Sequence, residues 1–260
     1  MNTKDLIRSP KSNVEFLSNV ILTKQNVERI NRTLEYLPTA KKGEILLDIG
    51  SYACMIPLFH NKDYKNIIAV TNVEWEEMNK NLENDNLRVI VKDMEKGRLP
   101  LKKESVDAVL LLEVLEHFSI DPMNCMVEIN RVLKKNGILI LTTPNAISKK
   151  IISRVLAGRN PIPEKFNGFN SDRHNRLYTP EEIKKLIKSS GLEVEKIKTF
   201  DVSNQYLVAR LTACVCDLFN WTQGYRGDYI LAKGVKKGKI IDRKPDWLYK
   251  DRERWKKGMV

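Results

Sequence analysis

Cysteine is scarce in this sequence: there are four residues in a chain of 260. A chain of this size with four cysteines does not have the dense framework of a small disulfide-stabilised domain. Cys214 and Cys216 are separated by one residue, so they lack the two-residue gap of a zinc or redox pair. We therefore expect the cysteines to be small core residues, and the sequence predicts no metal site.

Long apolar runs are also missing. The first thirty residues hold no apolar block of signal-peptide length, and nowhere do eighteen uncharged apolar residues follow one another. The longest apolar stretches have the length of buried strands. We expect a cytoplasmic protein without a transmembrane segment.

Acidic residues are outnumbered, since 45 Lys and Arg stand against 33 Asp and Glu and give a formal net charge of +12. This excess favours an anionic partner such as nucleic acid, a phosphorylated glycan precursor or a membrane surface. A lysine-rich and glutamate-rich surface that is simply solvated is the alternative.

Short apolar runs alternate with helical segments through the middle of the chain. Such runs indicate buried parallel strands, and the alternation predicts an α/β fold with a doubly wound sheet and helices on both faces. Ligands of these sheets bind beyond the carboxyl ends of the strands. The predicted strands are 44–48, 66–70, 87–91, 106–112, 137–142, 192–200 and 228–235.

Outside the predicted strands, apolar residues at helical spacing mark several predicted helices. Residues 14–36 and 121–133 carry apolar residues at helical spacing, and Thr179, followed by Pro180 and Glu182, forms a capping-box pattern. Residues 206–219 read as another apolar helix. Residues 146–176 begin as a basic amphipathic segment and continue as a loop, the usual form of a lid. We predict an N-terminal helical segment (1–40), a main domain (41–240) with this lid, and a charged tail (241–260) with Trp247, Tyr249 and Trp255 as anchors.

Several segments resemble the class I S-adenosylmethionine-dependent methyltransferases. Leu46-Leu-Asp-Ile-Gly50 is similar to their first motif, and Glu113-Val-Leu-Glu-His117 looks like the end of their fourth strand. Glu128 to Asn145 resembles their fifth helix–strand unit, and Arg173 to Ile183 resembles a type 11-like subgroup that is often linked to surface-glycan assembly.

The resemblance implies a seven-stranded sheet whose last strand inserts antiparallel beside the fifth. It also implies S-adenosylmethionine as cofactor. Asp93 and Met94 correspond to the pair that contacts adenine in that family. The implied cofactor-binding residues are Asp48, Gly50, Ser51, Tyr52, Thr71, Asn72, Asp93, Met94, Leu112 and Glu113.

Two features depart from that pattern. Tyr52 and Cys54 stand where the family's first loop has glycines, and the second strand ends in Thr71 and Asn72 where nucleotide-binding sheets usually carry an acid. Both departures argue against a nicotinamide dinucleotide, which needs the same glycines and the same acid.

Methyl transfer needs an aligned nucleophile and a dry site, and an oxygen nucleophile also needs a base. The candidate catalytic residues are His117, His174 and Glu113, with a helix-capping histidine as the alternative for His117. The candidate substrate-binding residues are Asn145, Arg173, His174 and Arg176, because two guanidiniums suit a phosphate or carboxylate. Both arginines could equally pair with nearby surface acids.

These features favour methyl transfer to oxygen, and less so to nitrogen, of a small or glycan-type acceptor. The charge permits an RNA methyltransferase. However, no appended RNA-binding module is evident, and no Asn/Asp-Pro-Pro-Tyr motif follows the fourth strand. The altered glycine loop and the missing acid leave a third alternative, a catalytically silent binding protein that keeps the fold.

Overall fold

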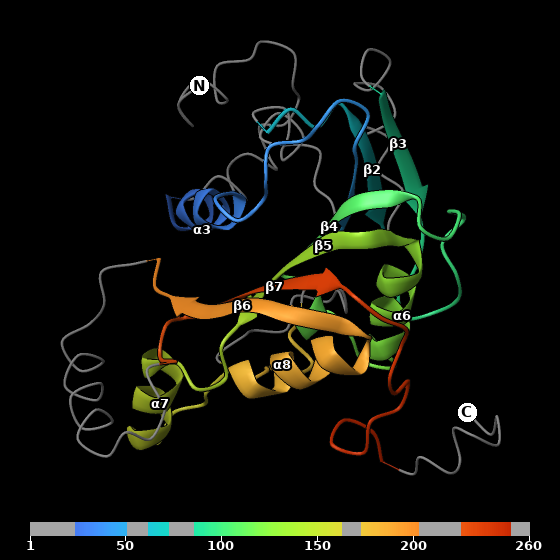
Figure 1. Ribbon diagram of the computed structural model, residues 1–260. Helices are drawn as coiled ribbons and strands as arrows, with labels where there is room; N and C mark the ends of the chain where they lie inside the picture. Colours follow the sequence, from blue (N-terminus) through green and yellow to red (C-terminus); the bar gives the residue numbers. More distant parts are fainter. Residues whose placement is uncertain (1–23, 51–61, 73–85, 163–172, 203–224, 251–260) are drawn as a thin grey trace.

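The computed structural model describes residues 24–50, 62–72, 86–162, 173–202 and 225–250. Within these ranges seven strands form one sheet in the order β3-β2-β1-β4-β5-β7-β6 (Figure 1). Their bounds are Ile45–Ile49 (β1), Asn66–Thr71 (β2), Asn86–Val91 (β3), Val106–Leu112 (β4), Leu133–Pro144 (β5), Leu192–Phe200 (β6) and Tyr229–Lys236 (β7). Each predicted strand is present, most within a residue of its predicted ends.

The sheet is parallel from β3 to β5, and β7 runs antiparallel to both of its neighbours, β5 and β6. This confirms the predicted α/β architecture with an antiparallel last strand beside the fifth. The order reverses at β1, whose partners are β2 on one side and β4 on the other. In open α/β sheets, ligands bind beyond the carboxyl ends of the strands at this reversal.

Four α-helices accompany the sheet in the described ranges: Lys24–Leu34 (α3), Pro122–Val132 (α6), Lys149–Leu156 (α7) and Pro180–Ser189 (α8). A short 3-10 helix, Leu115–His117 (η2), follows β4. The capping box of α8 is confirmed, because Thr179 and Glu182 each accept a hydrogen bond from the other's backbone N–H. The predicted helix at 206–219 lies outside the described residues.

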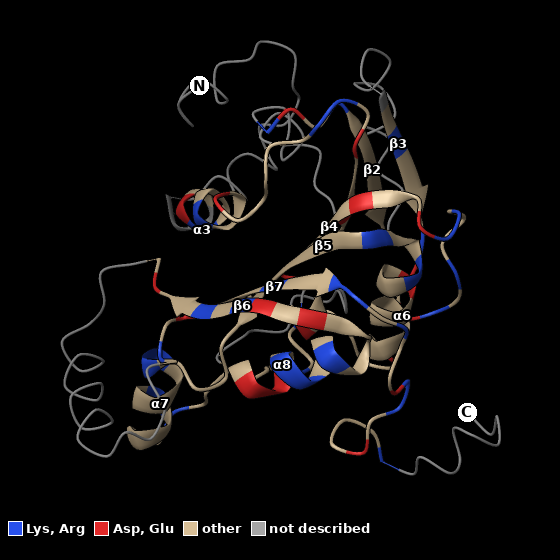
Figure 2. Ribbon diagram, viewed as in Figure 1, with Lys and Arg blue, Asp and Glu red and all other residues tan. Residues whose placement is uncertain are grey.

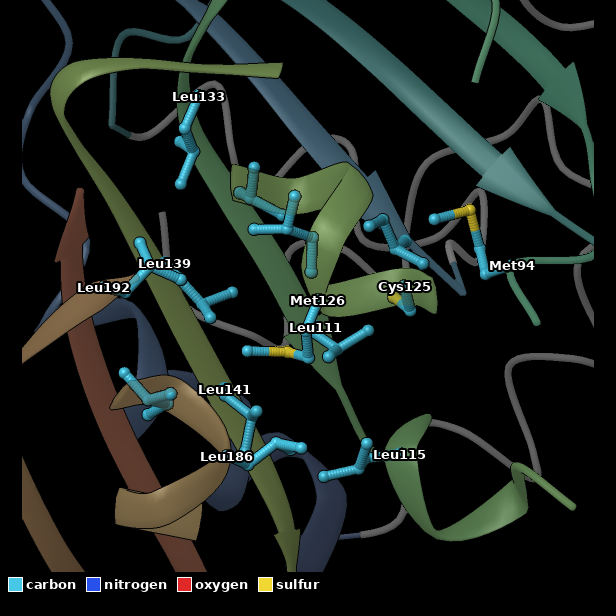
Figure 3. Packing of buried hydrophobic residues seen from close by; sticks show 14 of the residues in the cluster. Met94, Leu111, Leu115, Cys125, Met126, Leu133, Leu139, Leu141, Leu186 and Leu192 are labelled. Carbon is cyan, nitrogen blue, oxygen red and sulfur yellow. The ribbon is translucent and has the colours of Figure 1, made fainter. Parts of the chain in front are cut away.

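Alternate residues of the central strands pack against different helices. Leu47, Val109 and Leu139 face a large cluster that contains buried side chains of α6 and α8. Leu46, Leu110 and Ile140 face a second cluster built with α3. Figure 3 shows part of the first cluster, in which side chains of β4, β5 and α6 converge. The sheet is therefore covered on both faces, which explains why its strands are continuous apolar runs.

The C-terminal segment up to residue 250 is held against α6. Trp247, Leu248 and Tyr249 pack on the large core cluster, and the Tyr249 hydroxyl donates a hydrogen bond to Asp121. Two of the predicted anchors therefore contact the domain, while Trp255 lies outside the described residues.

Charged residues of both signs occur along β6 and α8 (Figure 2). Glu195 pairs with Lys233 and Glu181 pairs with Lys184, in each case with at least one half-exposed side chain. α7 differs, because it carries Lys149, Lys150 and Arg154 and buries none of its residues. In the described part of the chain, no helix combines the length and apolar character that crossing a bilayer requires.

Candidate methyl-transfer site

The loops that follow β1 and β4 meet at the carboxyl edge of the sheet. Gly50 has φ = +76°, and a Cβ built on it would lie 2.3 Å from Cγ2 of Val114. Its N–H donates to the carbonyl of Val70, so the turn is tied to β2 as well. Only glycine fits this left-handed position without strain. The chain can thus turn sharply where the sheet order reverses.

Replacing Gly50 with alanine should lower the free energy of unfolding by about 2 kcal/mol, because a left-handed conformation alone costs about 1–2 kcal/mol and the new methyl group must also displace Val114. Gly43 offers a matched control, since its φ is +85° but nothing lies within 4 Å of an added Cβ. Urea unfolding should show a smaller loss for Gly43→Ala than for Gly50→Ala. Equal losses of stability in the two variants would mean that the Val114 side chain can move away from the added methyl group without destabilising the fold.

Other predicted cofactor residues lie along the same edge. Asp48 and Thr71 are buried at the ends of β1 and β2, Asn72 is exposed just after β2, and Leu112 ends β4 half-buried. The fold thus brings these strand ends together. Ser51 and Tyr52 lie outside the described residues.

Asp93 and Met94 follow β3 but face different surroundings. The Asp93 side chain is 48% exposed, accepts a hydrogen bond from the Glu95 N–H and lies 3.4 Å from the Lys96 ammonium. Met94 is 6% exposed and belongs to the large core cluster (Figure 3). The carboxylate can therefore reach a ligand, whereas the Met94 side chain packs mainly into the core.

Glu113 follows the last residue of β4 and has a left-handed conformation, with φ = +57°. Its carboxylate lies 3.3 Å from a guanidinium nitrogen of Arg29 on α3, and both side chains are largely buried. Burial raises the pKa of Glu113, and the Arg29 charge opposes the rise. Arg29 also lies 5.6 Å from the ring centre of Tyr229, whose pKa burial raises to about 12. Arg29 on α3 therefore makes charged contacts with the residue after β4, Glu113, and with the first residue of β7, Tyr229.

Glu116 lies three residues after Glu113, in η2, and is completely buried. One carboxylate oxygen accepts a hydrogen bond of 2.9 Å from the Thr143 hydroxyl. The other, Oε1, lies 3.9 Å from Nε2 of His174 and has no hydrogen-bond partner among the described residues. Burial, together with the negative charge of Glu113, holds the pKa of Glu116 well above its usual range. Two carboxylates are thus held close together with little solvent.

The far end of the predicted lid is fixed to η2 by hydrogen bonds. The N–H groups of Asn175 and Arg176 donate to the carbonyl of Glu116, and the Asn175 amide donates to that of His117. Nδ1 of His117 lies 3.1 Å from the carbonyl of Arg173. These contacts bring the His117 and His174 rings to 5.0 Å between centres. Three of the predicted residues, His117, His174 and Arg173, therefore gather at one place.

Asn145 and Arg176 are engaged in holding the fold. The Asn145 side chain is fully buried, donates to the carbonyls of Tyr225 and Gly227 and accepts from the Ile147 N–H. Arg176 makes a 2.6 Å ion pair with Glu182 and lies over the Tyr178 ring. This pairing with a nearby acid is the alternative that the sequence left open for Arg176.

Arg29, Glu116 and Thr143 were not among the residues predicted for the site. Glu116 had a visible signal, because it sits between Glu113 and His117 in the motif after β4. Arg29 gave no such signal, since its partner lies far along the chain and only the packing of α3 brings them together. The structure thus adds the buried acid Glu116, with Thr143 and Arg29 near it, to the histidines that the sequence predicted for the site.

Comparison with known proteins agrees with this arrangement. Residues 47–141 match the family model described as a methyltransferase domain. A Mycolicibacterium smegmatis protein described as a "Probable S-adenosylmethionine-dependent methyltransferase" is 31% identical over 108 residues, which cover 42% of this chain and 37% of that protein. The matched segment thus spans little more than a third of that relative.

Solved structures share the fold at low sequence identity. A SAM-dependent methyltransferase of Archaeoglobus fulgidus aligns with a TM-score of 0.57 and 15% identity, over 86% of this chain and all of that one. A geranyl diphosphate C-methyltransferase of Streptomyces coelicolor, solved with S-adenosyl-L-homocysteine among its ligands, aligns with a TM-score of 0.55 and 14% identity, over 90% and 88% of the two chains.

The sheet order, the turn at Gly50 and the match over residues 47–141 lead to one conclusion. Residues 47–141 are similar to a methyltransferase domain, and the chain shares the fold of solved S-adenosylmethionine-dependent methyltransferases.

Proposed function

We propose that the protein transfers a methyl group from S-adenosylmethionine to an oxygen atom of a small-molecule or glycan-type acceptor. The observation that carries this proposal is the group of polar side chains at the carboxyl end of β4. Glu113, Glu116, His117 and His174 gather there, beside the turn at Gly50. An oxygen nucleophile must lose a proton during transfer, and this group holds the acids and imidazoles that can take it.

We propose that the cofactor binds at the ends of β1, β2 and β3, because the residues there offer the space and the hydrogen-bonding groups that it needs. The left-handed Gly50 lets the backbone turn with no side chain in the way, and exposed Asn72 and Asp93 present hydrogen-bonding groups after β2 and β3. Asn72 could donate to or accept from a ribose hydroxyl in place of the usual acid. Asp93 could accept from the adenine amine. When bound, the cofactor supplies a methyl group that its sulfonium has already activated.

The task left to the protein is to orient the acceptor, exclude water and remove a proton. We assign the proton-handling role to the imidazole of His174, with buried Glu116 beside it at 3.9 Å. The hydrogen bonds that tie residues 173–176 to η2 hold His174 in place. Arg173 is exposed at the start of the same segment, where its charge suits an anionic acceptor. The net charge of +12 supports such an acceptor as well.

Asp93→Ala should weaken cofactor binding by about 0.5–1.5 kcal/mol, the net contribution of one hydrogen bond at a carboxylate that solvent also reaches. Asp93→Asn keeps an amide oxygen that can accept both from adenine and from the Glu95 N–H, so it should bind more tightly than the alanine variant. Calorimetry with S-adenosylhomocysteine measures both. An affinity unchanged by Asp93→Ala in a folded protein would place the adenine elsewhere.

An acceptor screen tests the proposed function. The protein is incubated with S-adenosylmethionine that carries a labelled methyl group and with panels of hydroxyl-bearing small molecules, phosphorylated sugars and oligosaccharides, with RNA as a separate panel. We expect label on oxygen of a compound in the first three panels. Transfer to RNA alone would contradict the assignment of the acceptor, and the absence of transfer with every panel, despite cofactor binding, would favour a silent binding protein.

A further inference from the structure

Glu116, His117 and His174 together offer a set of metal-ligating atoms that the reaction of a methyltransferase does not itself require. One carboxylate oxygen and one nitrogen from each imidazole lie within 4.8 Å of one another. Ligands of one ion are at most about twice a 2.0–2.2 Å bond apart. Small side-chain rotations would therefore bring all three atoms into one coordination sphere.

The surroundings of the Glu116 carboxylate favour a cation as its partner. Its side chain is completely buried, Oε2 is held by the Thr143 hydroxyl, and Oε1 faces His174 with no hydrogen-bond donor among the described residues. Leaving a buried carboxylate oxygen without a donor is costly, and such groups are normally paired or coordinate a metal. The Arg29 charge is already engaged with the neighbouring Glu113. A divalent ion would supply the partner that Oε1 lacks.

His117 is oriented in the way that metal-binding histidines usually are. A carbonyl oxygen can only accept, so the 3.1 Å contact between His117 Nδ1 and the Arg173 carbonyl places the proton on Nδ1. The lone pair is then on Nε2, in the tautomer that can coordinate a metal. Ligating imidazoles commonly donate their other N–H to a backbone carbonyl in this manner.

We propose that Glu116, His117 and His174 bind one divalent transition-metal ion, such as Zn²⁺ or Mn²⁺. Two imidazoles and one carboxylate match the three-protein-ligand sites of catalytic zinc, which leave a further position open, and they favour transition metals over Ca²⁺ or Mg²⁺. This inference rests on the proposed function for its role: a hydroxyl of the acceptor would occupy the open position, and the metal would lower the pKa of that hydroxyl. His174 would then act as a ligand instead of a base: the metal would lower the pKa of the acceptor hydroxyl, whose proton would pass to solvent water, and the alkoxide oxygen would take the methyl group as the sulfonium becomes a neutral thioether.

Titration of metal-free protein with Mn²⁺, followed by electron paramagnetic resonance, tests the site. Mn²⁺ prefers oxygen and nitrogen ligands, so the four cysteines should compete little. We expect one bound ion per chain, displaced by Zn²⁺, and an affinity at least about tenfold lower in Glu116→Gln and in His174→Ala, because even outer-sphere partners of a metal change affinity about 10- to 100-fold. His174 is partly exposed, so its replacement should be tolerated if that of Glu116 is not.

Glu181→Gln is the matched control, since it removes the same charge from an exposed position on α8. It should bind Mn²⁺ as the unmodified protein does. Equal affinities of the unmodified protein and both site variants, or no binding at millimolar Mn²⁺, would overturn the proposal. Binding of S-adenosylhomocysteine to the metal-free protein is measured in parallel, because its loss would instead count against the proposed function.

Discussion

His174→Ala should lower the turnover number for methyl transfer by about 10²–10⁴-fold, the usual contribution of a positioned proton-transfer group. The same loss follows if the imidazole is a metal ligand, because the acceptor hydroxyl would lose the group that activates it in either case. The affinity for S-adenosylhomocysteine should change little, since His174 lies beside Glu116 and not at the ends of β1 to β3. Steady-state kinetics with the acceptor found by the screen, together with calorimetry, separate the two quantities.

A structural role of His174 would give a different pattern. If the 173–176 segment were merely loosened, the unfolding midpoint and the cofactor affinity would fall together with turnover. Asn175→Ala serves as the control, because it removes an amide that holds the same segment to the His117 carbonyl and leaves both imidazoles in place. A loss of turnover as large as that of His174→Ala would contradict a direct role for the histidine.

Arg29→Met should destabilise the fold by about 3 kcal/mol, because removing one partner of a buried ion pair leaves the other charge uncompensated. Glu113 would then be buried beside Glu116 without its guanidinium. A loss of this size corresponds to a melting temperature lower by about 6–12 °C in a domain of 150–250 residues. Replacing Glu113 with glutamine in the same protein should restore much of the stability, since the orphaned charge is removed.

Arg32 provides a control on the same helix. It pairs with Glu28, and about 40% of each side chain is exposed, so Arg32→Met should cost less than about 1 kcal/mol. Thermal and urea unfolding of the two single variants and the double variant measure the difference. If Arg29→Met and Arg32→Met cost the same, the pair between Arg29 and Glu113 does not hold α3 to the sheet.

The strands could be predicted from the sequence because the sheet is buried on both faces. Strands such as Val106–Leu112 must then be apolar at nearly every position, and that signal is local. The start of α8 was equally visible, since Thr179, Pro180 and Glu182 carry their capping information within four residues. The strand order and the antiparallel β7 came from the resemblance, because apolar periodicity does not show which strands are neighbours.

The start of β5 was predicted too late. The sequence places it at Gly137, whereas the structure begins the strand at Leu133, directly after α6. The intervening residues are polar, and the pairing with β4 shifts register there, between Val106 and Ala108. Lys134 is held by an ion pair of 2.8 Å with Asp107, and Asn136 has φ = +63°. A polar segment with an irregular register looks like a loop in the sequence, because its pairing with the neighbouring strand is not visible there.

His117, His174 and Glu113 of the candidate site were predicted from the sequence. Its other residues Arg29, Glu116 and Thr143 were not. Buried acids are uncommon unless they are paired, so Glu116 would be expected on the surface until packing shows otherwise. The lid predicted at 146–176 is described at both ends, as α7 and as the segment tied to η2, while residues 163–172 lie outside the described ranges. Its role as a cover stays a prediction.

The most direct test of the central claim is a calorimetric titration of the purified protein with S-adenosylhomocysteine. We expect saturable binding of one molecule per chain, weakened in Asp93→Ala and unchanged in Glu181→Gln, whose side chain is exposed on α8. That result would locate the cofactor at the carboxyl edge of the sheet despite Tyr52 and Asn72. A folded protein that binds neither S-adenosylhomocysteine nor S-adenosylmethionine would contradict the claim that this domain transfers methyl groups.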